Sequence, residues 1–176
     1  MRTLKLLLIS LTVFFSLSIL FSSKVKADTE GTVTATITIG VVSVTVAPTS
    51  FDYGTMPFSS TAESFDIIDE EGDKNIESTV GTLVTDLDIK GASTVAWTLS
   101  DTAIGENQYM HKFGDATDST TRPASYTALT TGYDNDLADD VAASGSVWFG
   151  LEIHSPSSGT TTQQSAVVTV LASWAG

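Results

Sequence analysis

The stretch SVWFGLEIH, residues 146–154, decides the fold class of this chain. Val147, Phe149, Leu151 and Ile153 occupy every second position, which places four apolar side chains on one face of an extended strand. The residues between them form a mixed face. A strand that is apolar on one face only is typical of a sheet that covers a core with one side and meets water with the other.

The same period of two recurs along the chain. Residues 32–39 alternate threonine with apolar side chains, and the alternation resumes after Gly40 as far as Val46. Gly40 predicts a bulge or a bend, either between two strands or within one long strand. A short helix of one or two turns is expected only at 136–143. Further strands are predicted at 64–68, 79–85, 87–89, 95–99, 126–129 and 165–174.

Many short strands, separated by turns and without a clear helical period, indicate an all-β protein. The expected architecture is an antiparallel β-sandwich of immunoglobulin-like or jelly-roll type. A closed barrel is the alternative, because periodicity does not show which strand edges are paired. Trp97 follows Val95 in an apolar stretch and precedes Leu99, so we expect its ring to lie in the core.

The N-terminus has the composition of a signal peptide. Arg2 and Lys5 precede an apolar run from Leu6 to Phe21, and a small residue, Ala27, follows. We expect cleavage after Ala27, which leaves one domain at residues 28–176 of a secreted or cell-surface protein. The alternative is that the segment is retained as a membrane anchor, for which the apolar run is short.

Charge limits the partners of the expected mature domain. All 21 acidic residues follow Ala27, against four basic ones, so the formal charge of residues 28–176 is 4 − 21 = −17. Such a surface repels nucleic acid and, after signal cleavage, anionic membranes. The remaining partners are the protein itself, other surface proteins or cell-wall polysaccharide.

The residues that carry catalysis are sparse. The chain has no cysteine, which removes thiol chemistry and disulfides, and only two histidines, His111 and His154. Neither lies in a recognisable motif of a nucleophilic hydrolase. We therefore expect no enzyme, no catalytic residues and no bound cofactor. A secreted hydrolase that works through carboxylates is the least favoured alternative.

One acidic cluster has the composition of a calcium site. Oxygen-bearing side chains recur every second residue around Gly72, and calcium prefers several such ligands on a flexible loop. The spacing is not that of an EF-hand. Ordinary charged turns are the alternative, both here and at the second acidic group, residues 134–140. The predicted ligands are Asp69, Glu71, Asp73, Asn75 and Glu77.

Two short patterns resemble WxL-type bacterial cell-surface domains. The first is Phe51-Asp52-Tyr53-Gly54 after Pro48, and the second is Trp97-x-Leu99. A second Trp-x-Leu near the C-terminus is typical of that family, whereas this chain ends Trp174-Ala175-Gly176. The resemblance implies an exported surface domain that binds peptidoglycan without a covalent link.

Two hypotheses of function follow. The first is an exported, non-catalytic structural or surface-associated protein that assembles with itself or adheres. The second is a module that binds cell-wall glycan.

We predict that the exported protein begins at Asp28, because Val25-x-Ala27 offers signal peptidase a site after a short apolar run. Mass spectrometry of the exported protein tests this. An intact N-terminus at Met1 or Arg2 would contradict it.

Overall fold

The computed structural model describes residues 34–69 and 72–176, and this part of the chain is all-β. It contains ten strands, one short 3-10 turn and no α-helix. All of these elements lie in a compact unit that runs from Ile39 to Gly176. The predicted signal peptide, residues 1–27, lies outside the described residues.

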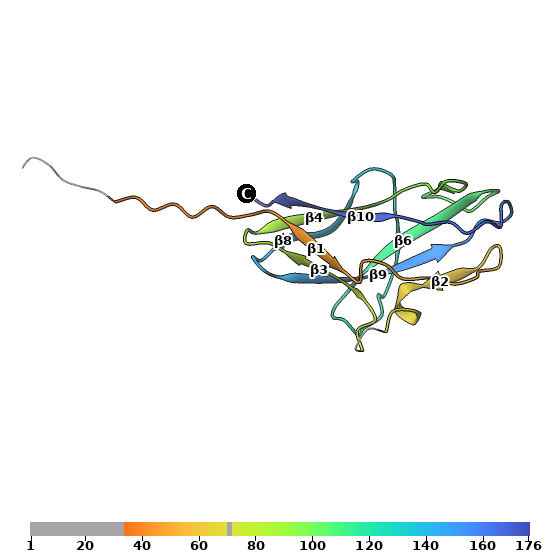
Figure 1. The fold of residues 1–176 in the computed structure, drawn as a ribbon, viewed down its shortest axis with the longest axis horizontal. Coiled ribbons are helices and arrows are strands. Elements are labelled where there is room, and N and C mark those ends of the chain that lie inside the picture. Colours follow the sequence, from red (N-terminus) through yellow and green to blue (C-terminus); the bar gives the residue numbers. More distant parts are fainter. Residues whose placement is uncertain (1–33, 70–71) are drawn as a thin grey trace, which may run out of the picture. The chain divides into compact units, whose positions relative to one another are not determined.

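The larger of two sheets has seven strands (Figure 1). Its strand order is β1-β3-β9-β6-β5, while β2 pairs with β9 and β7 pairs with β6. All pairs are antiparallel except β5 with β6. The strands are β1 (Val44–Ala47), β2 (Thr61–Glu63), β3 (Ile76–Val80), β5 (Thr98–Leu99), β6 (Gln108–Ala116), β7 (Thr127–Ala128) and β9 (Ser146–His154).

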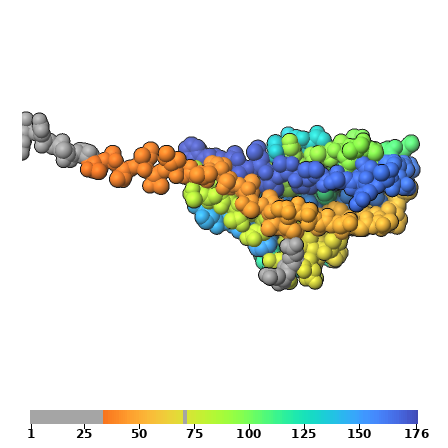
Figure 2. Space-filling model, in the orientation of Figure 1, coloured from red at the N-terminus to blue at the C-terminus, as the bar shows by residue number. Residues whose placement is uncertain are grey.

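The smaller sheet has three antiparallel strands in the order β10-β4-β8. Its strands are β4 (Thr85–Gly91), β8 (Asn135–Val141) and β10 (Val168–Trp174). In Figure 2, the segment after β1 (orange) and the segment leading into β10 (blue) run along the same face of the domain.

β9 is central because both of its edges are paired, with β3 and β2 on one side and with β6 on the other. Its alternating residues Phe149, Leu151 and Ile153 are buried. They belong to one hydrophobic core that also contains Leu87 of β4 in the smaller sheet. The strand predicted from the alternation at 146–154 is confirmed with the same bounds.

Two glycines let a loop lie against the larger sheet. Gly150 of β9 pairs with Gly114 of β6. A Cβ on Gly150 would lie 2.8 Å from the Cγ of Pro123, and a Cβ on Gly114 would lie 2.3 Å from the carbonyl oxygen of Ser125. Glycine at both positions therefore makes room for the connection between β6 and β7.

Asn75 anchors the same connection from the other side. Its amide nitrogen donates hydrogen bonds to the carbonyl oxygens of Asp118, at 2.8 Å, and Thr121, at 2.7 Å. Only 1% of Asn75 is exposed. The loop thus depends on a buried donor, which explains a polar residue beside the apolar start of β3.

Several strand predictions were wrong because local hydrogen bonds outweighed residue preference. The segment 64–68 forms a 3-10 turn at Ser64–Asp66, since the amides of Ile67 and Ile68 both bond to the carbonyl of Ser64. The segment 95–99 is a strand only at its last two residues. The residues before β5 form a turn, because the amide of Thr94 donates a hydrogen bond to the carbonyl of Trp97, and Val95 is fully exposed.

Three further predictions need correction. The segment 79–85 is divided between the end of β3 and the start of β4. The helix expected at 136–143 is mostly β8, an edge strand with register shifts against β4. Within 34–46, only the part from Val44 onward is strand.

Three predicted strands are confirmed in whole or in part. The strand predicted at 165–174 is present from Val168 onward as β10, and the strand predicted at 126–129 is present at its two central residues as β7. The strand predicted at 87–89 lies within β4.

We predict that Asn75→Ala lowers the free energy of unfolding by about 3 kcal/mol, because the connection between β6 and β7 loses two hydrogen bonds from a buried side chain. Asn135→Ala is the matched control. Its amide makes a single long bond of 3.5 Å to Ala128, so its loss should cost less than about 1 kcal/mol. Urea unfolding of both variants decides the point, and equal losses would show that Asn75 does not anchor the loop.

Candidate functional site

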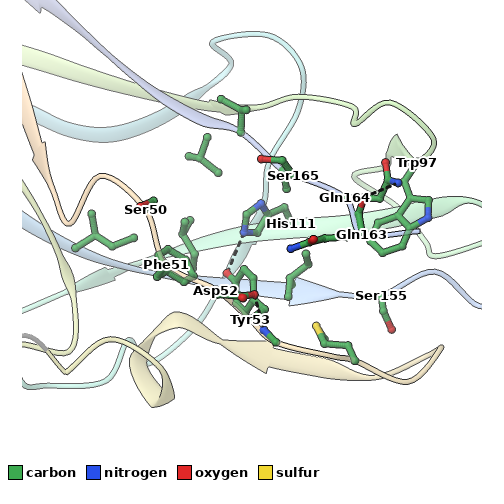
Figure 3. A pocket seen from close by; sticks show the side chains of 18 of the residues that line it. Ser50, Phe51, Asp52, Tyr53, Trp97, His111, Ser155, Gln163, Gln164 and Ser165 are labelled. Atoms are coloured by element: carbon green, nitrogen blue, oxygen red, sulfur yellow. Dashed lines mark hydrogen bonds between the residues drawn. The ribbon is translucent and has the colours of Figure 1, made fainter. Parts of the chain in front are cut away.

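A groove of about 1730 Å³ opens between the two sheets (Figure 3). One wall is formed by β1 and the segment 48–58 that follows it. The other wall is formed by residues 160–168 and the beginning of β10. The floor is mostly apolar and comes from β3, β6 and β9 of the larger sheet. Its residues are Ile76, His111, Phe149, Leu151 and Ile153.

The two strands that border the groove each have one unpaired edge. Within the described residues, β1 pairs only with β3, and β10 pairs only with β4. The segments 50–56 and 165–167 likewise form no hydrogen bond between backbone groups in the described part of the chain. Backbone groups normally find partners, so two such edges beside an apolar floor favour the binding of another extended chain.

His111 is the most buried polar group of the groove, with 2% of its surface exposed. Its Nε2 forms a hydrogen bond of 3.1 Å with the hydroxyl of Tyr53, a residue of the wall. Its Nδ1 is buried and has no hydrogen-bond partner among the described residues. Burial lowers the pKa of His111 to about 4 and raises that of Tyr53, so the imidazole is neutral at pH 7.

Trp97 lies at another part of the groove and is half-buried. Its ring packs against Tyr109, with 6.1 Å between the centroids, and its Nε1 is buried without a partner in the described structure. Gln164 belongs to the wall formed by residues 160–168 and links this wall to the turn before Trp97 by hydrogen bonds. Its side-chain oxygen accepts hydrogen bonds from the amide of Ala96, at 3.0 Å, and the hydroxyl of Thr94, at 2.8 Å.

The groove carries almost no charge. Asp52 is the only acidic residue that lines it, and no lysine or arginine does so. The formal charge of the whole chain is −13. The lining is therefore suited to apolar and hydrogen-bonding groups rather than to strongly ionic ones.

The residues predicted to bind calcium do not form a closed group in the described structure. Asp69 and Asp73 are exposed, Glu77 lies on β3, and Asn75 is buried with its amide bonded to the loop. Glu71 lies outside the described residues. Within 34–69 and 72–176, no three histidine, aspartate or glutamate side chains are close enough to hold one metal ion. The calcium site stays a prediction.

The second histidine, His154, lies away from the groove. Its Nε2 bonds to Glu152 at 2.7 Å, and its Nδ1 lies 3.4 Å from the hydroxyl of Thr61. Lys112 also bonds to Glu152, at 3.0 Å. The order hydroxyl, imidazole, carboxylate has a formal likeness to a hydrolase triad, but none of these four residues lines the groove.

Sequence reasoning named two parts of the groove without seeing that they meet. Phe51 and Tyr53 were noted within a local pattern, and their rings pack edge to face with 4.9 Å between centroids. His111, which lies in no recognisable hydrolase motif, is on β6, a nine-residue strand that is not among those predicted from the sequence. The signal in the sequence that could have indicated this wall of the groove is the pair Phe51 and Tyr53, which follows soon after a predicted strand.

Comparison with protein families, with curated proteins and with solved structures finds no match to this chain. In the described part of the chain, no helix is long and apolar enough to cross a membrane.

We predict that His111 makes the domain less stable in acid. Between pH 6.5, near the ordinary pKa of histidine, and about pH 4, the unfolded chain binds a proton that the folded chain does not. The free energy of unfolding therefore falls as the pH falls through this window, by about 3 kcal/mol from this group.

Urea unfolding at several pH values measures the effect as a difference between variants. His111→Gln should lose about 3 kcal/mol less than the unaltered protein between pH 6.5 and 4. Parallel curves for the two proteins would refute the assignment.

Proposed function

We propose that this chain is an exported, non-catalytic structural subunit of the cell surface that assembles with copies of itself. In this proposal its two sheets form an antiparallel sandwich of immunoglobulin-like or jelly-roll type. The observation that carries the proposal is the groove, because two unpaired strand edges border an apolar floor. Such an arrangement is the usual basis of strand addition.

The composition supports the same function. A cysteine-free exported chain gains no stability from disulfides, and assembly is one way to supply further burial. The nearly uncharged lining of the groove also suits an uncharged segment of another copy better than an ionic ligand. The acidic surface opposes close contact between copies, so assembly should strengthen with salt.

A cell-wall glycan is the second candidate ligand. Trp97 and the side chains of Gln163 and Gln164 line the same groove, and indole rings with amides are suited to sugar rings. However, Trp97 packs against Tyr109, which leaves less of its face for stacking. A pull-down with purified peptidoglycan separates the two functions, and retention of the monomer on it would favour the glycan.

We predict that the exported protein forms oligomers or fibres whose size increases with protein concentration and with salt. Light scattering after size exclusion, together with negative-stain electron microscopy, measures this. Val167→Lys should strongly weaken assembly, because Val167 is 55% exposed beside the free edge of β10 and lysine blocks edge pairing.

Val95→Lys is the matched control. Val95 is fully exposed and does not line the groove, so this variant should assemble like the unaltered protein. A stable monomer at high concentration and high ionic strength would overturn the proposed function.

A further inference from the structure

We propose that the groove receives residues 34–39 of a second copy of this chain, which add as a strand between the segment 50–56 that follows β1 and the segment 165–167 that precedes β10. This inference rests on the proposed function and names the segment through which the copies join. Each copy would thus offer its own residues 34–39 to the next, which gives a head-to-tail assembly.

The groove lacks what an added strand supplies. The segments 50–56 and 165–167 line the groove and form no hydrogen bond between backbone groups in the described part of the chain, so an extended segment between them can pair with both. The buried Nδ1 of His111 and Nε1 of Trp97 also lack partners within the described chain. With the Tyr53 hydroxyl donating to Nε2 of His111, its Nδ1 carries the hydrogen, so His111 and Trp97 each keep one unused donor at the groove.

The segment 34–39 has the pattern that this site requires. Its sequence alternates Thr34, Thr36 and Thr38 with apolar residues, so one face suits an apolar floor and the other suits water. The whole stretch from Gly31 to Phe51 is uncharged, which matches a groove with a single acidic residue. Six extended residues span about 20 Å, close to the length of the seven-residue β10.

The backbone next to this segment excludes Ile39 from the groove of its own domain. Val41 is fastened to the connection between β3 and β4, because its carbonyl accepts a bond of 3.1 Å from the amide of Thr82. Its own amide donates to the hydroxyl of Thr82 at 2.9 Å, and the carbonyl of Ser43 accepts a bond from Gly81 at 2.9 Å. The chain therefore stays in line with β1 as far back as residue 41.

Gly40 alone separates Val41 from Ile39, whereas the shortest common hairpins have two residues in the loop. Gly40 does not adopt a positive φ, and a Cβ at this position would lie 2.2 Å from a methyl carbon of Leu83. Its lack of a side chain serves close packing rather than a turn. Ile39 is consequently 85% exposed, an unusual position for a large apolar residue that starts the domain.

Cross-linking between two differently tagged copies tests the inference directly, since the natural chain has no cysteine. Ile37→Cys in one copy and Ser165→Cys in the other place single thiols on the added segment and on the groove wall. After mixing and mild oxidation, we expect a disulfide-linked heterodimer. Thr131→Cys in place of Ser165→Cys is the control, because Thr131 is exposed and does not line the groove.

Aspartate substitutions on either face of residues 34–39 test which face of this segment enters the groove. Ile37→Asp with Ile39→Asp should weaken assembly by about 100-fold or more, because two apolar side chains would lose their burial. Thr36→Asp with Thr38→Asp adds the same charge on the opposite face and should change assembly much less. Thermal unfolding of the two double variants should be alike.

The outcomes separate this inference from the proposed function. Assembly that persists in the Ile37→Asp, Ile39→Asp variant, with no heterodimer, would overturn the added strand and leave self-assembly standing. A cross-link that forms only within one copy, in a double-cysteine chain, would also overturn it. A protein that stays monomeric and gives no heterodimer would overturn both.

Discussion

The pairing of backbone edges is the constraint on which the rest of this structure depends. β9 can form the middle of the larger sheet because β3, β2 and β6 satisfy both of its edges, and its residues Phe149, Leu151 and Ile153 join the core that both sheets share. Within the described chain, β1 and β10 lack this second partner, and they border the groove. The groove is thus the place where the domain's own strands fail to complete the pairing.

The distribution of charge follows the same division. Acidic residues cover exposed strands and loops, and on β4 and β8 they come close enough that burial and the neighbouring Asp136 raise the pKa of Asp88. The groove, by contrast, is nearly uncharged. In the proposed assembly, copies repel one another at long range and associate through the groove, so salt should change the rate and strength of association together.

The sequence predicted the all-β class and the central strand, because uninterrupted alternation at 146–154 reports burial on one face. It mispredicted β8, where register shifts and a positive φ at Asp140 disturb the period. It also mispredicted 64–68, where the hydroxyl oxygen of Ser64 accepts a hydrogen bond from the amide of Leu151, just after the end of β2. The groove was beyond prediction, because its walls come from segments about 110 residues apart that only the pairing of both sheets brings together.

Amide hydrogen exchange measured over a range of protein concentrations tests most directly whether the groove edges are completed by another copy. Added-strand pairing predicts that residues 165–170, at the free edge of β10, become protected as assembly proceeds, while the exposed bend at 131–134 does not change. Unchanged exchange at 165–170 while particle size increases would contradict it, because the copies would then join through another surface.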